Sequence, residues 1–182
     1  MVRFWNQVLK EKEVVENKEI IRYAIIQLRD YILGILVTIF IGYKMGIVFQ
    51  SLAFLLFFIP LRIYAGGYHA SSRIRCAIIS IILLILSFLF IKSKVVPENI
   101  SIWLGQIEGA ILYFLIPVNG KYSMEMVERI VYRERGRKII LLEMVMLCLL
   151  KIMGFETFVI TIISSFSTIL LLIIIQKVND MR

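Results

Sequence analysis

Six long apolar stretches are the feature that most restricts what this chain can fold into. Hydrophobic residues make up 60% of its 182 residues, more than a single soluble core needs. Apolar stretches of this kind predict helices that cross a membrane. The sequence therefore predicts one all-α, polytopic membrane domain over residues 1–182, with about six spans between residues 31 and 176. Turn-forming or charged residues separate the stretches, which cover residues 31–43, 46–61, 77–91, 100–118, 139–153 and 157–176.

Several stretches are shorter than the roughly 20 residues that a hydrocarbon core of about 30 Å requires. Lysines beside them are therefore expected to extend their ammonium groups toward the headgroups, namely Lys44, Lys92 and Lys151. Residues 42–46 fit either a tight hairpin between two spans or an interruption of one long helix. We expect the hairpin, because residues 31–61 are too many for one ordinary crossing.

The first 30 residues are charged and carry apolar residues in clusters at helical spacing. This pattern predicts an amphipathic helix at the membrane interface over residues 1–30. The segment has no apolar run that ends at a small-residue cleavage site, so we do not expect a signal peptide.

The basic residues predict which side of the membrane each segment faces. Six spans place both termini on one side, and that side carries 17 of the 21 Lys and Arg residues. The positive-inside rule therefore predicts cytoplasmic termini, a cytoplasmic segment 62–76 and a basic cytoplasmic loop 119–138. This imbalance also explains the formal charge of +8 without a nucleic-acid partner, which we do not expect.

Segment 62–76 contains the residues best suited to chemistry. His69 is the only histidine, and Cys76 is one of two cysteines, which are too few for a His/Cys zinc cluster. A Cys/His pair can act as a nucleophile with its base, but an unbroken helix would separate these residues by about 10.5 Å. A break between them is therefore required, and Gly66 and Gly67 supply the backbone freedom for it.

A helix start just before Cys76 would complete this arrangement. If Ser72 is the N-cap, Cys76 lies in the first turn, where the helix dipole and nearby arginines favour a nucleophilic sulfur. A Cys at this place is also often a small apolar filler, and a lone His in a loop often faces solvent. Ser71 and Ser72 are weaker nucleophile candidates, because capping explains them.

Two polar residues and three small residues in the later stretches also raise functional possibilities. Glu108 falls inside a span, which makes it a candidate for substrate passage or subunit pairing. The alternatives are an interhelical hydrogen bond or a protonated, buried carboxyl. Gly105 and Gly109 permit close helix packing, for instance in a homodimer. Glu143 is expected to reach a nearby arginine or the headgroups, and Cys148 to be inert packing.

One motif in segment 62–76 consists of Arg62, Gly67-Tyr68-His69-Ala70, Ser71-Ser72 and Cys76. In this motif the sequence resembles the accessory gene regulator B family of Gram-positive bacteria, membrane cysteine endopeptidases that process quorum-sensing propeptides. The chain length, the basic N-terminal segment and the six apolar stretches also fit this family. The family's loop after Pro117 is usually rich in Lys and Pro, whereas residues 119–125 here read Asn-Gly-Lys-Tyr-Ser-Met-Glu.

The resemblance implies that Cys76 is the nucleophile and His69 its base, and that Arg62 and Gly67 bind substrate or shape the site. An ordinary positive-inside anchor is the alternative role for Arg62. It implies a short amphipathic propeptide as substrate, a homodimer in the bacterial cytoplasmic membrane, and no metal or cofactor. The expected products are a released C-terminal fragment and a thiolactone or lactone ring. A small six-helix transporter or peptide exporter is the main rival interpretation, and a non-catalytic assembly factor is another.

Overall fold

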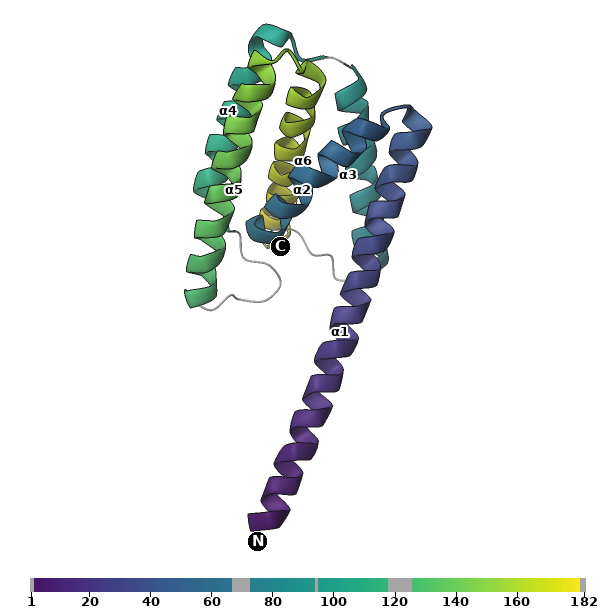
Figure 1. Ribbon diagram of the computed structural model, residues 1–182, viewed down its shortest axis with the longest axis vertical. Coiled ribbons are helices and arrows are strands. Elements are labelled where there is room, and N and C mark those ends of the chain that lie inside the picture. The colour runs from purple at the N-terminus through teal and green to yellow at the C-terminus, as the bar shows by residue number, and fades with distance from the viewer. Residues whose placement is uncertain (1, 67–72, 94, 118–125, 181–182) are drawn as a thin grey trace. The chain divides into compact units, whose positions relative to one another are not determined.

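The computed structural model describes residues 2–66, 73–93, 95–117 and 126–180 of the chain. Within these ranges the chain forms six α-helices joined by short connections, which confirms the predicted all-α fold (Figure 1). The helices are α1 (Val2–Met45), α2 (Val48–Ala65), α3 (Arg73–Ser93), α4 (Glu98–Leu115), α5 (Met126–Ile152) and α6 (Glu156–Asp180).

The chain divides into two units, Met1–Phe40 and Ile41–Arg182. The first unit consists largely of α1, a single helix of 44 residues and hence about 66 Å long. We expected a boundary between an interfacial helix and a first span near residue 30, but the helix continues through it. The physical reason is that no Gly or Pro precedes Gly34 in the sequence, so nothing interrupts the hydrogen-bond ladder.

A turn is present at residues 42–46, as expected, because α1 ends at Met45 and α2 begins at Val48. That this turn separates two membrane spans stays a prediction, because α1 is not among the described helices that are long and apolar enough to cross a membrane. Gly46 has a φ of +73°, and its N–H donates to the Tyr43 carbonyl at 3.1 Å. The N–H of Ile47 donates to the Gly42 carbonyl at 2.8 Å, which completes a Schellman motif. Helix α5 ends with the same motif at Gly154, which has a φ of +76°.

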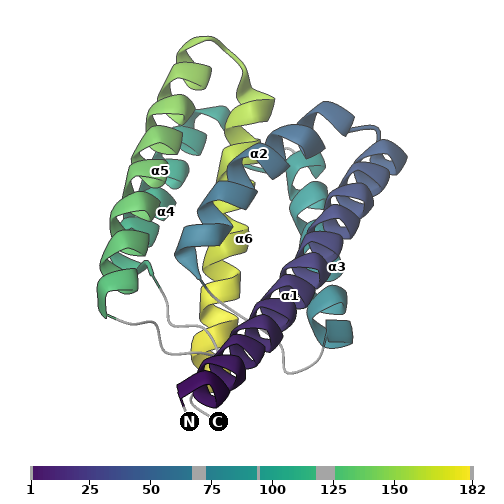
Figure 2. The same cartoon turned by 60° about the horizontal axis from the view of Figure 1, so that its bottom comes forward.

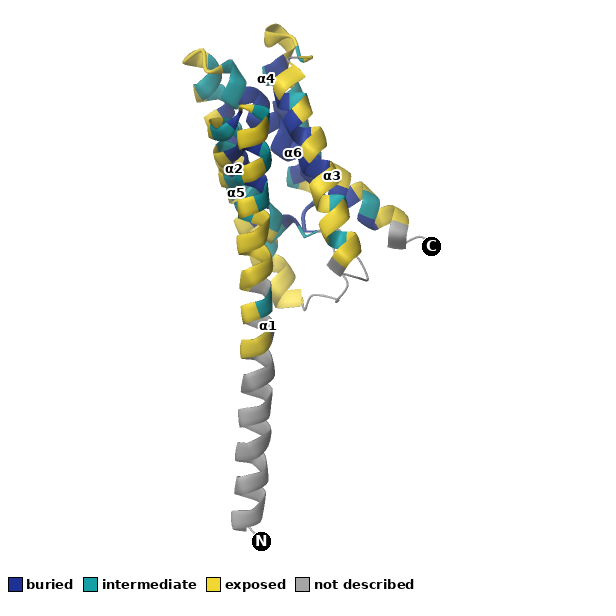
Figure 3. Cartoon of the chain, turned by 90° about the vertical axis from the view of Figure 1, so that its right-hand side faces the viewer, coloured by how far each residue is buried: buried dark blue, intermediate teal, exposed yellow. Residues whose placement is uncertain are grey.

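The second unit is a bundle in which α2 to α6 alternate in direction and α6 packs against each of the other four (Figure 2). In the apolar stretch of α6, 67% is buried inside the structure (Figure 3). The corresponding share in α3, which packs mainly on α6, is 22%. The core lies where α2, α4 and α5 meet α6, around Phe57, Leu112, Leu147 and Phe166. The last helix in the chain is therefore the central one.

Three of the described helices are long and apolar enough to cross a membrane, judged by length and composition: Val48–Ala65, Ile74–Ser93 and Glu156–Val178. Polar residues reduce the apolar character of the other expected spans, as Gln106 and Glu108 do in α4. The outward faces of the helices are nonetheless apolar, as with Ile78 and Leu89 on α3. Such faces suit lipid, and the count of about six spans stays a prediction.

The basic segment expected to be a loop over residues 119–138 is helical from Met126 onward. Residues 119–125 lie outside the described part of the chain. Most residues from Met126 to Arg135 have good helix propensity, which allows α5 to begin well before its apolar stretch. The basic residues of this segment are therefore carried mainly on a helix.

Candidate active site

The last turn of α2 leads into the segment that the sequence singles out. Arg62 lies in this turn, and its Nη1 donates a hydrogen bond to the carbonyl oxygen of Gly66, four residues later. Gly66 has φ 72° and ψ −146°, a conformation that is nearly restricted to glycine. The expected backbone break therefore begins at Gly66. Gly67 and His69 lie outside the described residues.

The first turn of α3 carries Cys76, whereas Ser72, the expected N-cap, lies outside the described residues. Because α3 begins at Arg73, Cys76 is the fourth residue of the helix. Its thiol forms no disulfide, and the residue is half-buried rather than fully buried or fully exposed. Arg75 is exposed on the same turn. Of the four predicted site residues, the structure thus describes Arg62 and Cys76.

A packing junction holds the end of α2 against α4 and α5. Gly136 on α5 is buried so closely that a Cβ atom there would lie 2.6 Å from Cδ1 of Ile116 and 3.2 Å from Cβ of Tyr64. The Tyr64 ring meets that of Tyr132 on α5 edge to face, with centroids 5.6 Å apart. We call Tyr64, Ile116, Tyr132 and Gly136 the α2–α5 junction.

Arg137 fixes α5 to the end of α4 beside this junction. Its Nε donates to the Tyr113 carbonyl at 3.2 Å, and its guanidinium carbon lies 4.6 Å from the centroid of the Tyr113 ring. Together these contacts combine a hydrogen bond with a cation–π interaction. Arg137 therefore does not approach Glu143, contrary to one expectation from the sequence.

Glu143 is instead buried on the inner face of α5, with 3% of the residue exposed. Its Oε2 has no hydrogen-bond partner among the described residues. The expectation that this carboxyl reaches the headgroups is wrong, because Glu143 shares a helix face with Ile140 and Leu147, which point into the core. We found no structural reason for an acid at this place.

Glu108 makes an interhelical hydrogen bond, which was one of the expectations for it. Its Oε1 accepts a hydrogen bond from Ser167 Oγ on α6 at 2.7 Å. Its Oε2 is buried and has no partner within the described part of the chain. Gln106, two residues earlier, donates to the Met144 carbonyl and to the Cys148 sulfur, each at 3.2 Å. Cys148 therefore serves in packing between α4 and α5.

Gly105 and Gly109 allow α4 to approach α5 and α6 within one chain. A Cβ on Gly109 would lie 2.8 Å from Cγ of Met144 and 3.2 Å from Cε2 of Phe166. A Cβ on Gly105 would overlap Leu147. The small-residue pattern is thus explained by contacts inside the bundle and lends no support to a dimer.

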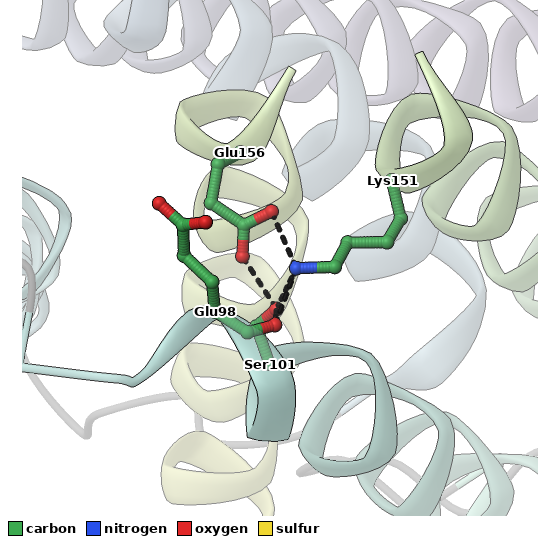
Figure 4. Close-up of polar contacts among 4 residues, drawn as sticks. All are labelled: Glu98, Ser101, Lys151 and Glu156. Carbon is green, nitrogen blue, oxygen red and sulfur yellow. Dashed lines mark hydrogen bonds and ion pairs between the residues drawn. The ribbon is translucent and has the colours of Figure 1, made fainter. Parts of the chain in front are cut away.

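A polar cluster at the opposite end of the bundle from Gly66 joins α4, α5 and α6 (Figure 4). The Lys151 ammonium lies 2.8 Å from Glu156 Oε2 and 3.3 Å from Ser101 Oγ, and it also donates to the Glu98 carbonyl. Ser101 Oγ donates to Glu156 Oε1 at 2.6 Å. The Glu156 carboxylate holds the Lys151 ammonium at the α5–α6 turn, and the expected extension of this ammonium toward the headgroups stays a prediction.

Sequence reasoning missed both the α2–α5 junction and this polar cluster. An isolated glycine among charged residues at Gly136 was the one available signal for the junction, since such a glycine often marks a close approach. Among the residues that the structure describes, no three His, Cys, Asp or Glu side chains are grouped to hold a metal ion.

Comparison with known proteins connects this arrangement to a family. The sequence model of the family described as Accessory gene regulator B matches residues 2–178. An AgrB-like protein of Clostridium perfringens strain SM101 (type A) is 30% identical over 104 residues, which are 56% of this chain and 49% of that protein. An AgrB-like protein 2 of Clostridium perfringens strain 13 (type A) is 29% identical with the same coverage.

The chain thus spans about half the length of the curated relatives that it matches. No solved structure matches it. The family match, by contrast, covers nearly the whole chain, including both helices that flank the Gly66–Cys76 segment. This chain therefore belongs to the Accessory gene regulator B family.

Proposed function

We propose that this protein is a membrane cysteine endopeptidase that removes the C-terminal part of a short quorum-sensing propeptide and promotes ring closure. One observation carries the proposal. Cys76 is half-buried in the first turn of α3, and only residues 67–72, which include the sole histidine, connect that turn to the glycine-specific bend at Gly66. So short a connection keeps His69 near Cys76 in sequence while the helix break frees it to turn back.

In the proposed first step, His69 accepts the Cys76 thiol proton as the sulfur attacks the carbonyl carbon of the scissile bond. A C–S bond forms, the C–N bond breaks, and His69 returns the proton to the departing amine. The N-terminal part of the propeptide is then a thioester on Cys76, and the C-terminal fragment leaves. Backbone N–H groups in the first turn of α3 are suited to stabilise the oxyanion of the tetrahedral intermediate.

In the proposed second step, a propeptide thiol attacks the thioester carbon. A new C–S bond forms as the bond to Cys76 breaks, and the thiol proton returns to Cys76 through His69. Exchange of one thioester for another needs no ATP, whereas attack by water would give a linear peptide. A position at the membrane interface would limit that hydrolysis.

The proposal includes the orientation of the protein in the membrane. In the second unit, the ends of α2 and α6 and the starts of α3 and α5 lie at one end of the bundle (Figure 1). Most basic residues of that unit belong to these helix ends, such as Arg62, Arg75, Arg133 and Lys177. We therefore propose that this end, with both chain termini, faces the cytoplasm of the bacterial cell.

The test is intact-mass spectrometry of the full chain in nanodiscs after mixing with a candidate propeptide, to be sought in a short reading frame beside the gene. The wild type should gain the mass of the N-terminal peptide fragment and release the C-terminal tail. Cys76→Ala and His69→Ala should do neither. Cys148→Ala is the matched control and should behave as wild type, because Cys148 contacts Gln106 between α4 and α5.

A transporter or peptide exporter without covalent chemistry is the second candidate, and Glu108 is the observation that favours it. This carboxyl is largely buried between α4 and α6 and keeps one oxygen without a partner in the described chain. The endopeptidase proposal fails if the wild type, Cys76→Ala and His69→Ala are all folded and all leave the cognate propeptide uncleaved. Peptide flux that depends on Glu108 but not on Cys76 would then support transport. A homodimer also remains a proposal, taken from the family resemblance.

A further inference from the structure

The first turns of α5 project beyond the helices that α5 packs against. Gly136 lies against Ile116, which directly follows the last residue of α4, and against Tyr64 in the last turn of α2. The ten residues from Met126 to Arg135 therefore extend past the ends of α2 and α4 by about 15 Å (Figure 1). Nine of them are exposed, and only Tyr132 is half-buried. We call residues 126–135 the α5 extension.

One face of the α5 extension is apolar although it is exposed. Its residues are Met126, Val127, Ile130 and Val131, which are 81%, 71%, 53% and 39% exposed. Ile130 and Leu141 are 11 residues apart, close to three helical turns, and Val127 and Val145 are 18 residues apart, or five turns. Leu141 and Val145 are themselves exposed on the outer side of α5. The apolar face of the extension thus continues the side of α5 that suits lipid.

Basic residues lie along both edges of this apolar face. Arg129 and Arg133 follow one edge, and Arg135 lies on the other. Glu134 and Lys138 interrupt the face where the extension joins the bundle. All four basic residues are exposed, and within the described part of the chain none of them forms an ion pair or a side-chain hydrogen bond. An apolar face with cationic edges is typical of a helix among anionic headgroups.

The length of α5 places the extension at the depth of the headgroups. A helix of 27 residues is about 40 Å long, whereas a hydrocarbon core is about 30 Å thick and a bilayer with its headgroups about 40–45 Å. If α5 crosses the bilayer, as expected, its first ten residues lie in the headgroup layer. The guanidinium group suits this layer, because it binds phosphate with two parallel hydrogen bonds.

We propose that the α5 extension binds anionic phospholipids. In this arrangement Ile130 and its apolar neighbours contact the upper acyl chains, and Arg129, Arg133 and Arg135 bind the headgroups. Lipid is favoured over a protein partner because the apolar face continues the outer side of the same helix, and the net charge of +3 over residues 126–138 favours an anionic headgroup. The inference does not depend on the chemistry proposed for Cys76.

A fluorescent probe at residue 130 tests the proposal. The full chain carries Cys76→Ala, Cys148→Ala and Ile130→Cys, so that nitrobenzoxadiazole labels one site. It is placed in nanodiscs of phosphatidylcholine with an increasing fraction of phosphatidylglycerol that has the same acyl chains. The emission should move to shorter wavelength as that fraction rises. The same probe at Glu128→Cys should keep its emission in water, because two residues on a helix face nearly opposite sides.

Variants of single charges measure the contribution of the headgroup contacts. With the probe at residue 130, Arg133→Gln should raise the fraction of phosphatidylglycerol at half of the spectral change about fivefold, the factor that corresponds to one basic residue at an anionic surface. Arg133→Lys keeps the charge and should stay close to the parent chain. Lys177→Gln is the matched control, because it removes an exposed charge from the end of α6, and it should leave the fraction unchanged.

Three results would overturn the proposal. The first is an emission that does not depend on the phosphatidylglycerol fraction, or an equal response in Arg133→Gln and the parent chain. The second is an emission that depends on whether a disc holds one chain or two, which would assign the face to contact between copies. The third is a shift that appears in pure phosphatidylcholine only when an acidic peptide is added, which would assign the face to a peptide.

Discussion

Substitution of Gly105 by alanine tests whether the glycines of α4 serve close packing inside one chain. The added methyl group would overlap Leu147 on α5 and lie 3.1 Å from Cγ1 of Ile163 on α6. Leu147 and Ile163 are both 0% exposed, so neither has solvent or lipid into which to move. The substitution should therefore force α4 away from its neighbours.

Two opposing terms decide the size of the effect. Replacing glycine by alanine inside a helix stabilises it by roughly 0.5–1 kcal/mol, whereas an extra methyl group in a packed core costs about 1–3 kcal/mol. Gly34→Ala isolates the first term, because no described atom lies within 4 Å of a Cβ at Gly34 in α1. The difference between the two variants is therefore the packing term alone, about 1–3 kcal/mol.

Thermal unfolding in detergent, followed by intrinsic tryptophan fluorescence, measures this difference. For a chain of this size about 1 kcal/mol shifts Tm by roughly 2–4 °C, so Gly105→Ala should melt about 2–12 °C below Gly34→Ala. Equal Tm values for the two variants would refute the reasoning. A selective loss of dimer in Gly105→Ala, with the monomer unchanged in Tm, would instead place Gly105 at a subunit interface.

Two further predictions concern the polar cluster and the bend. A double-mutant cycle with Lys151→Met and Glu156→Gln should give a coupling energy of about 1–2 kcal/mol, because both side chains are less than a quarter exposed. A coupling energy under about 0.3 kcal/mol would show that the ion pair does not stabilise the fold. Gly66→Ala should cost about 1–3 kcal/mol from backbone strain and should also reduce acyl-enzyme formation in the mass assay. Gly154→Ala is the control, because Gly154 also has a positive φ, of +76°, but lies at the other end of the bundle. It should lower Tm without changing the acyl-enzyme yield. Equal losses of yield in Gly66→Ala and Gly154→Ala would contradict a local role for Gly66.

The features that sequence predicted well are those fixed by neighbouring residues. The turn at Gly46 follows from local backbone chemistry, because glycine readily adopts a positive φ. Cys76 lies in the first turn of α3, as the sequence predicted. The wrong expectation for Glu143 shows the limit of this reasoning. The spacing of Glu143 from Ile140 and Leu147 places it on the core-facing side of α5, whereas its charge favours a position on the outer side of the helix.

The features that sequence did not predict arise from contacts between distant residues. Tyr64 and Tyr132 are 68 positions apart, and nothing in their local surroundings indicates that they meet. Lys151 and Glu156 are close in sequence, but Ser101 joins them only because α4 packs on both α5 and α6. The family resemblance identified the residues of the proposed chemistry, whereas the elements that support Arg62 and Gly66 required the fold.

The central place of α6 has a consequence for the order in which this protein is made. Helices α2 to α5 leave the ribosome first, yet the helix that each of them packs against is the last of the six to be synthesised. Until then α3 lacks the serine and threonine partners that α6 supplies, and α4 lacks the Ser167 hydroxyl for Glu108. The earlier helices can already pair through the α2–α5 and α4–α5 contacts, but the core that they share with α6 is completed only when α6 is present.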